Sequence, residues 1–228
     1  MDGASVATAT QGAGRMIARV ATVAFQGIDV LDIDVQVQMS GGMPGFAIVG
    51  LADKAIGESR ERVRAALNSI GLSLPQKHIT VNLAPADVVK EGSHFDLPIA
   101  LGLLIAMGVL PVDAMDGYTV LGELALDGAI APVAGVLPAA IGASAAGRGI
   151  VCPEATGGEA AWAGGIEVLA PASLLALVNH VRGVQVLSPP PNPSSPRMGR
   201  PRPISPTSRA RRRRSAPSRW RRPARTTC

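Results

Sequence analysis

The sequence of 228 residues contains few of the residues that build metal centres, disulfide frameworks or aromatic surfaces. It has two cysteines, three histidines and only 3% aromatic residues. Cys152 and Cys228 form no metal-ligand pattern and no HExxH motif occurs, so we expect neither a metal ion nor a disulfide framework. The sequence also has no GxxxxGK[ST] phosphate loop and no GxSxG elbow, so we expect no bound cofactor and no catalysis of those kinds in this chain.

Long apolar runs are missing as well. No run reaches the roughly 18 apolar residues that a membrane-spanning helix needs, and the longest, residues 97–110, predicts a buried helix. The first residues show no basic segment followed by an apolar one, as a secretory signal would, so we expect a cytoplasmic location. Hydrophobic residues still make up 47% of the chain, which is enough to build a core.

Charge divides the chain into two unlike segments. Residues 189–228 contain 12 arginines, ten prolines, no lysine and no acidic residue. Residues 1–188 hold 10 basic and 17 acidic residues, which gives a net charge of −7. We therefore predict an acidic folded domain over residues 16–188, a disordered Arg/Pro-rich tail over 189–228 and a disordered extension over 1–15, because neither end has apolar periodicity.

Hydrophobic periodicity predicts interleaved strands and helices with two hairpins, an α+β fold with a mixed sheet. Asp53 and Asp96 are predicted to cap the first two helices, and the glycine-rich runs near Gly41 and Gly157 are predicted to be turns. Asp127-Gly128 is typical of a hairpin turn. The expected strands cover 17–25, 30–39, 46–51, 79–83, 118–126, 129–133, 149–152, 166–169 and 184–187; the expected helices cover 53–70, 97–110, 136–146 and 172–181.

The densest polar cluster of the acidic segment is KEGSHFD, residues 90–96. The favoured interpretation is a surface loop that ends in a helix cap. The alternative is a site at a helix N-terminus, where backbone N–H groups could hold an anion.

Three long strings carry a family resemblance: GMPGFAIVGLADKAIGESRERVRAAL from Gly42, ITVNLAPADVVKEGSHFDLPIALGLL from Ile79 and LGELALDGAIAPVAGVLPAA from Leu121. Across residues 16–188 the chain resembles the N-terminal domain of the YifB/ComM family of magnesium-chelatase-like AAA+ ATPases. The resemblance implies a Lon-protease-like fold of the ribosomal protein S5 domain 2 type, placed before an AAA+ motor that uses ATP and Mg. It also implies a hexameric assembly and a role in DNA branch migration during natural transformation.

Peptidases of the Lon type use a serine activated by a lysine amine. The resemblance places His94 at the serine position and Leu137 at the lysine position, so a Lon-like peptidase is the least favoured hypothesis. We expect the domain to contribute DNA or subunit contacts instead. For each single basic residue, however, a solvated helix face or scattered surface charge is the favoured interpretation, because residues 1–188 are acidic overall. The candidate contact residues are Lys54, Arg60, Arg62, Arg64, Lys77, Lys90, His94 and Asp96.

The Arg-rich tail supports two hypotheses. It could be a nucleic-acid-binding arm in which Arg211–Arg214 neutralise phosphates and Trp220 stacks on a base. However, its amino-acid composition, dominated by Arg, Pro, Ser, Ala and Thr, is typical of GC-rich DNA that is translated out of frame. With permitted codons, residues 203–208 read PDLADV in a shifted frame, which resembles the family's linker before its motor. The favoured hypothesis is therefore a truncated family member with a frameshift near Pro191-Asn192; the alternative is a small nucleic-acid-binding protein.

Overall fold

The structure is a computed structural model that describes residues 17–27 and 29–190. The extension predicted over residues 1–15 lies outside the described residues, as does the predicted tail from residue 191 onward. The predicted domain boundaries therefore stay predictions.

Nine strands, five helices and one 3-10 helix make up the described part of the chain. The strands are β1 (Ile17–Gln26), β2 (Asp29–Ser40), β3 (Gly45–Val49), β4 (His78–Ala84), β5 (Tyr118–Val120), β6 (Glu123–Leu124), β7 (Ile130–Ala131), β8 (Gly149–Val151) and β9 (Val168–Leu169). The helices are α1 (Asp53–Ser69), α2 (Asp96–Ala106), α3 (Val136–Ala145), α4 (Glu154–Ala160), η1 (Ala161–Ala163) and α5 (Leu174–Val181).

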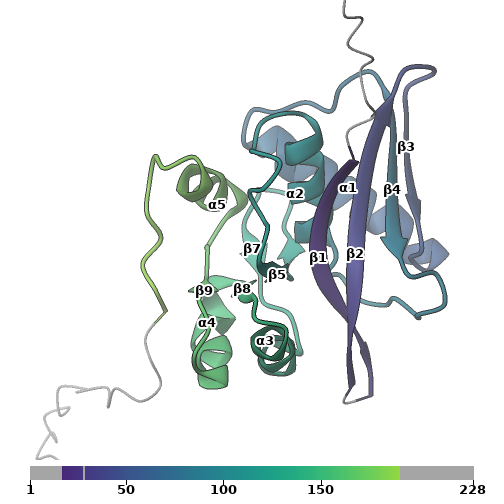
Figure 1. The fold of residues 1–228 in the computed structure, drawn as a ribbon. Coiled ribbons are helices and arrows are strands. Elements are labelled where there is room, and N and C mark those ends of the chain that lie inside the picture. Colours follow the sequence, from purple (N-terminus) through teal and green to yellow (C-terminus); the bar gives the residue numbers. More distant parts are fainter. Residues whose placement is uncertain (1–16, 28, 191–228) are drawn as a thin grey trace, which may run out of the picture. The chain divides into compact units, whose positions relative to one another are not determined.

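Seven of these strands form one mixed sheet in the order β3-β4-β2-β1-β5-β8-β9 (Figure 1). β1, β2 and β4 pair antiparallel, whereas β3 runs parallel to β4, and β5, β8 and β9 continue parallel to β1. β6 and β7 form a separate hairpin. The predicted α+β class with a mixed sheet is confirmed.

The sheet is covered differently at its two ends. In β2 the side chains of Ile33, Val35 and Val37 are buried, as the alternation predicts, and Val37 packs against α2. On the opposite face α3 packs over Val23 and Ile150, in a second, smaller cluster of the core. The β2–β4 end carries half-exposed polar side chains on that opposite face, because no helix among the described residues covers it there.

α2 is the central element of the core. Every residue from its first position to Ile105 is buried, as expected for a helix that is apolar on nearly all sides. α1 is amphipathic and buries Val63 and Leu67, as its sequence spacing predicts.

Several predicted boundaries were wrong. The strand predicted over residues 184–187 does not form; residues 184 and 185 are a bend after α5, and the segment pairs with no strand in the described part of the chain. The strand predicted over 118–126 is two strands, because β5 joins the main sheet and β6 turns into the hairpin around Asp127-Gly128. Gly157 lies inside α4 and not in the predicted turn; the sequence predicts no helix here, because two glycines in the seven residues of α4 give a weak helix signal.

The two predicted aspartate caps were also wrong. Ala52 and Phe95 occupy the N-cap positions of α1 and α2, and neither side chain can accept a capping hydrogen bond. Asp53 and Asp96 are the first residues of their helices, where a carboxylate still interacts favourably with the helix dipole.

None of the helices in residues 17–27 and 29–190 is long and apolar enough to cross a bilayer.

Candidate functional site

The polar cluster of residues 90–96 is largely buried, which corrects the interpretation as a surface loop. Lys90, His94 and Asp96 are all almost inaccessible to solvent, while Glu91 and Gly92 between them are exposed. Gly92 has a φ of +103°, and a Cβ there would lie 2.9 Å from Nδ1 of His94. The glycine therefore permits the tight turn that sends the flanking polar side chains inward.

The segment before β6 joins this cluster through its backbone. The N–H of Gly122 donates to the carbonyl of His94, and the N–H of Leu97 donates to the carbonyl of Gly122, both at 3.0 Å. These bonds place Glu123 and Leu124 beside the start of α2. Gly92 and Gly122 thus lie where the loop before α2 turns and where it meets the segment before β6.

Asp96 forms a buried ion pair with Arg62 of α1. The carboxylate accepts from the Arg62 guanidinium at 2.5 Å (Nε to Oδ2) and 3.2 Å (Nη2 to Oδ1), and it also accepts from the N–H of Leu124 at 3.4 Å. The side chain of Asp96 is 1% exposed and that of Arg62 is 21% exposed. Burial raises the pKa of Asp96 and the bonds from Arg62 oppose this, while the bond to Asp96 raises the pKa of Arg62. The pair thus fastens α1 to α2.

The other polar side chains of the cluster are satisfied within the chain. Ser93 Oγ donates to Oε2 of Glu123. Lys90 Nζ donates to the carbonyls of Pro85 and Val88, and burial lowers the pKa of this amine. The Lys90 bonds join residues within the loop before α2, and the Ser93 bond joins this loop to β6.

His94 is held between two aromatic rings. Its centroid lies 4.1 Å from that of Phe95 and 5.4 Å from that of Phe25, and its Nε2 donates to the carbonyl of Val23 at 2.9 Å. Burial lowers the pKa of His94, and the hydrogen bond to Val23 opposes this. The buried ring therefore packs between Phe25 and Phe95 and joins the segment just before α2 to β1.

The pKa of His94 predicts that stability falls as the pH drops from about 7 to 5. The unfolded chain takes up a proton near the ordinary histidine pKa of about 6.5, which the buried ring resists, so the unfolded state gains protons and stability is lost toward acid. Urea unfolding at both pH values should show a loss on the order of 1 kcal/mol that His94→Gln reduces. His78→Gln, at an exposed histidine of β4, is the control; an equal effect of both substitutions would contradict the assignment.

The arrangement at the two aligned peptidase positions is not that of a serine–lysine dyad. His94 occupies one position, and Leu137, the other, is a half-buried residue of α3 whose N–H donates to Glu159 at 3.2 Å. The neighbouring hydroxyl of Ser93 bonds a carboxylate, and the amine of Lys90 bonds carbonyl groups. A serine–lysine dyad needs the serine hydroxyl beside the lysine amine, and here Ser93 bonds the Glu123 carboxylate while Lys90 bonds backbone carbonyls.

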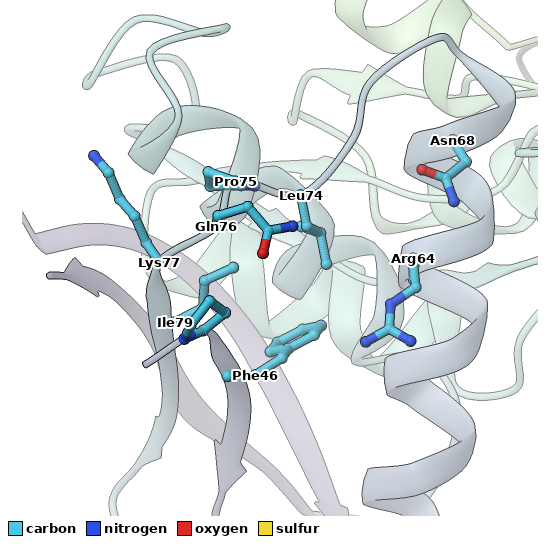
Figure 2. Close-up of a pocket in the computed structure, with 10 residues that line it drawn as sticks. Phe46, Arg64, Asn68, Leu74, Pro75, Gln76, Lys77 and Ile79 are labelled. Carbon is cyan, nitrogen blue, oxygen red and sulfur yellow. The ribbon is translucent and has the colours of Figure 1, made fainter. Parts of the chain in front are cut away.

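A pocket of about 320 Å³ lies between α1, β3 and the segment that leads into β4 (Figure 2). Arg64 and Phe46 face each other across it, and the Gln76 amide ends beside Leu74, whereas the Lys77 side chain points outward from the rim. Arg64 also bonds Glu61 at 3.2 Å, and the Arg60 guanidinium lies 5.9 Å from the centroid of the Phe46 ring. The pocket thus combines an apolar floor with a basic edge.

The structure separates the eight candidate contact residues into two groups. Lys54, Arg64 and Lys77 are exposed, and Arg60 and Arg62 are partly exposed along α1. Lys90, His94 and Asp96 are buried and bonded within the chain. Contact with DNA or a subunit stays a prediction for all eight.

Sequence reasoning missed Glu123 as the partner of Ser93 and Asp96 as the main partner of Arg62. Glu58, one turn before Arg62 on α1, also lies 3.8 Å from its guanidinium. The sequence contains a signal for the second pair. Asp96 begins a helix that is apolar on nearly all sides, and a carboxylate that is buried with such a helix needs a cationic partner. Which cation supplies it depends on the tertiary structure.

Among residues 17–27 and 29–190, no group of three or more His, Cys, Asp or Glu side chains is arranged to hold a metal ion.

Comparison with known proteins defines the class. A family model described as subunit ChlI of Mg-chelatase matches residues 35–156, more than half of the chain. The chain belongs to this Mg-chelatase-like family and, within it, to the YifB/ComM group.

Three relatives illustrate the similarity. The uncharacterized protein YifB of Escherichia coli K12 is 45% identical over 130 residues, which is 57% of this chain and 26% of the relative. The competence protein ComM of Haemophilus influenzae is 37% identical over 164 residues, 72% of this chain and 32% of the relative. An uncharacterized protein of Mycobacterium tuberculosis H37Rv is 38% identical over 168 residues, 73% of this chain and 33% of the relative. The matched part of this chain thus spans a quarter to a third of these relatives.

Proposed function

We propose that residues 17–190 form a non-catalytic module of a Mg-chelatase-like protein that processes DNA. The observation that carries the proposal is the hydrogen-bond network around the start of α2. In it the side chains of Arg62, Ser93 and Asp96 bond other groups of the same chain. Such bonds stabilise the fold, and none of them joins the Ser93 hydroxyl to a lysine amine as in a serine–lysine dyad. The module then acts by contact, through the exposed basic residues of α1 and the neighbouring loop.

The link to DNA is supported by one relative, whose name describes it as a competence protein. In the intact protein, ATP and Mg would be used by an AAA+ motor outside this module, assembled as a hexamer. The sequence has no phosphate loop of its own, so the chemistry would belong to that motor.

We further propose that the residues from about Pro191 onward are translated out of frame. The support is compositional: twelve arginines with no lysine and no acidic residue follow an acidic domain, which contains both basic residue types. The competing hypothesis, a functional Arg-rich arm, requires the same codons to be read in frame.

Resequencing the gene around the codon for Asn192 tests the frameshift. We expect a shift of a single base to open a frame that continues into a GxxxxGK[ST] motif. If neither alternative frame encodes such a motif, the frameshift proposal is wrong and the functional arm is favoured.

The non-catalytic role has a separate test. The frame-restored protein should hydrolyse ATP and respond to DNA, and Ser93→Ala should leave both activities unchanged within about twofold, because Ser93 only bonds Glu123. Loss of activity in this variant, with unchanged urea unfolding, would show that the hydroxyl takes part in chemistry.

A further inference from the structure

β3 presents a free strand edge. It is the terminal strand of the seven-stranded sheet, and β4 is its partner among the described strands (Figure 1). The N–H of Gly45 donates to the carbonyl of Lys77 at 3.2 Å, so the backbone groups of Gly45 face β4. Because these groups alternate along a strand, those of Phe46 and Ile48 point away from the sheet.

Within the described residues, β3 itself contains no charged residue, proline or bulge. Natural edge strands are blunted by a charged residue, a proline or a bulge within the strand. β3 has the sequence GFAIV and pairs with β4 in unbroken register over all five residues. Pro44 precedes the strand and does not interrupt the row of outward groups that begins at Phe46.

The pocket of Figure 2 lies directly beside this edge. Gly45 and Phe46 of β3 belong to its wall, α1 supplies the opposite side, and Leu74 and Ile79 complete an apolar floor. An extended segment added to a strand edge turns alternate side chains to the same side. A segment paired with β3 would therefore place a side chain at the pocket where it passes Gly45 and Phe46.

The charge beside the edge is opposite to that of the domain. Arg64 and Lys77 line the pocket, and Arg60 lies over Phe46, whereas residues 1–188 carry a net charge of −7. Of the nearby carboxylates, Glu61 bonds Arg64 and compensates one of these cations. The surroundings thus favour an acidic occupant with an apolar side chain for the floor.

We propose that the β3 edge and the adjoining pocket bind an extended acidic peptide segment, which pairs with β3 as an additional strand. Backbone hydrogen bonds to Phe46 and Ile48 supply the affinity, and the basic side chains together with the pocket select the sequence. This binding site goes beyond the proposed function and does not depend on the reading frame of the tail.

The test measures the binding of a labelled peptide, Glu-Val-Asp-Thr-Glu-Val-Asp, to the full chain by fluorescence anisotropy. A second peptide of identical charge has N-methyl groups on its three central residues and cannot form a strand ladder. Because the Arg-rich tail attracts both peptides equally, strand addition should make the unmethylated peptide bind about tenfold or more tightly. Equal affinities would overturn the proposal.

Variants locate the site. Arg64→Gln and Lys77→Gln should each weaken binding of the unmethylated peptide about three- to tenfold. Lys54→Gln removes the same charge from an exposed residue outside the pocket and should change the affinity less than twofold. An unchanged peptide affinity in both pocket variants overturns the proposal. A single-stranded oligonucleotide of equal charge is measured in the same variants. If Arg64→Gln and Lys77→Gln weaken its binding more than that of the peptide, the proposal is also overturned.

Discussion

Replacing Asp96 by alanine is expected to lower the free energy of unfolding by about 3 kcal/mol. The substitution leaves the partly buried Arg62 side chain without its main carboxylate partner and removes the acceptor of the Leu124 N–H. Removing one partner of a buried pair is costly because the other charge stays out of water. Urea unfolding followed by circular dichroism measures the loss.

The control for this prediction is a surface pair on the same helix. Glu61 bonds Arg64 at 3.2 Å, with side chains that are 67% and 46% exposed. Solvent screens such pairs, so Glu61→Ala should change the free energy of unfolding by less than about 1 kcal/mol. If both substitutions cost the same small amount, the Arg62–Asp96 pair does not fasten α1 to α2.

Two helix glycines should respond to alanine with opposite sign. A Cβ at Gly102 of α2 would lie 2.6 Å from Cγ2 of Val37, which is much closer than atoms in a packed core approach. Gly102→Ala should therefore lower the free energy of unfolding by about 1–3 kcal/mol, despite the better helix propensity of alanine. The glycine is what allows α2 to approach β2 closely.

Gly57 of α1 is the matched position, because a Cβ there has no heavy atom within 4 Å beyond its own helix and neighbours. Gly57→Ala should raise the free energy of unfolding by about 0.5–1 kcal/mol, since alanine restricts the unfolded chain and favours the helix. Thermal and urea unfolding of both variants decide the matter. Stabilisation by Gly102→Ala would contradict the close packing of α2 on β2.

The long elements were predictable because each has an unambiguous local period. β2 alternates from Leu31 to Met39, α1 has an apolar stripe with charged residues around it, and α2 is apolar on nearly all sides. Short elements were less predictable. α4 is seven residues rich in glycine, and the segment 184–187 has strand-like composition but pairs with none of the strands in residues 17–27 and 29–190.

The candidate site shows the same division. The basic residues of α1 are visible in the sequence, and so is the polar string KEGSHFD. The sequence does not show which of these residues are paired or buried. Arg62 and Asp96, for example, lie 34 residues apart and meet only when α1 packs on α2. The pocket beside β3 likewise requires α1, β3 and the segment before β4 to come together.

The sequence by itself determined the fold class, the family resemblance, the acidic domain and the change of composition near residue 189, because each depends on local pattern or on amounts of residue types. Only the tertiary structure decided that the polar residues before α2 are buried and paired, and that β3 ends the sheet with its edge open beside a basic pocket. The physical reason is that burial and pairing depend on which distant segments pack together, and hydrophobic periodicity specifies which face of a segment is buried without specifying its partner.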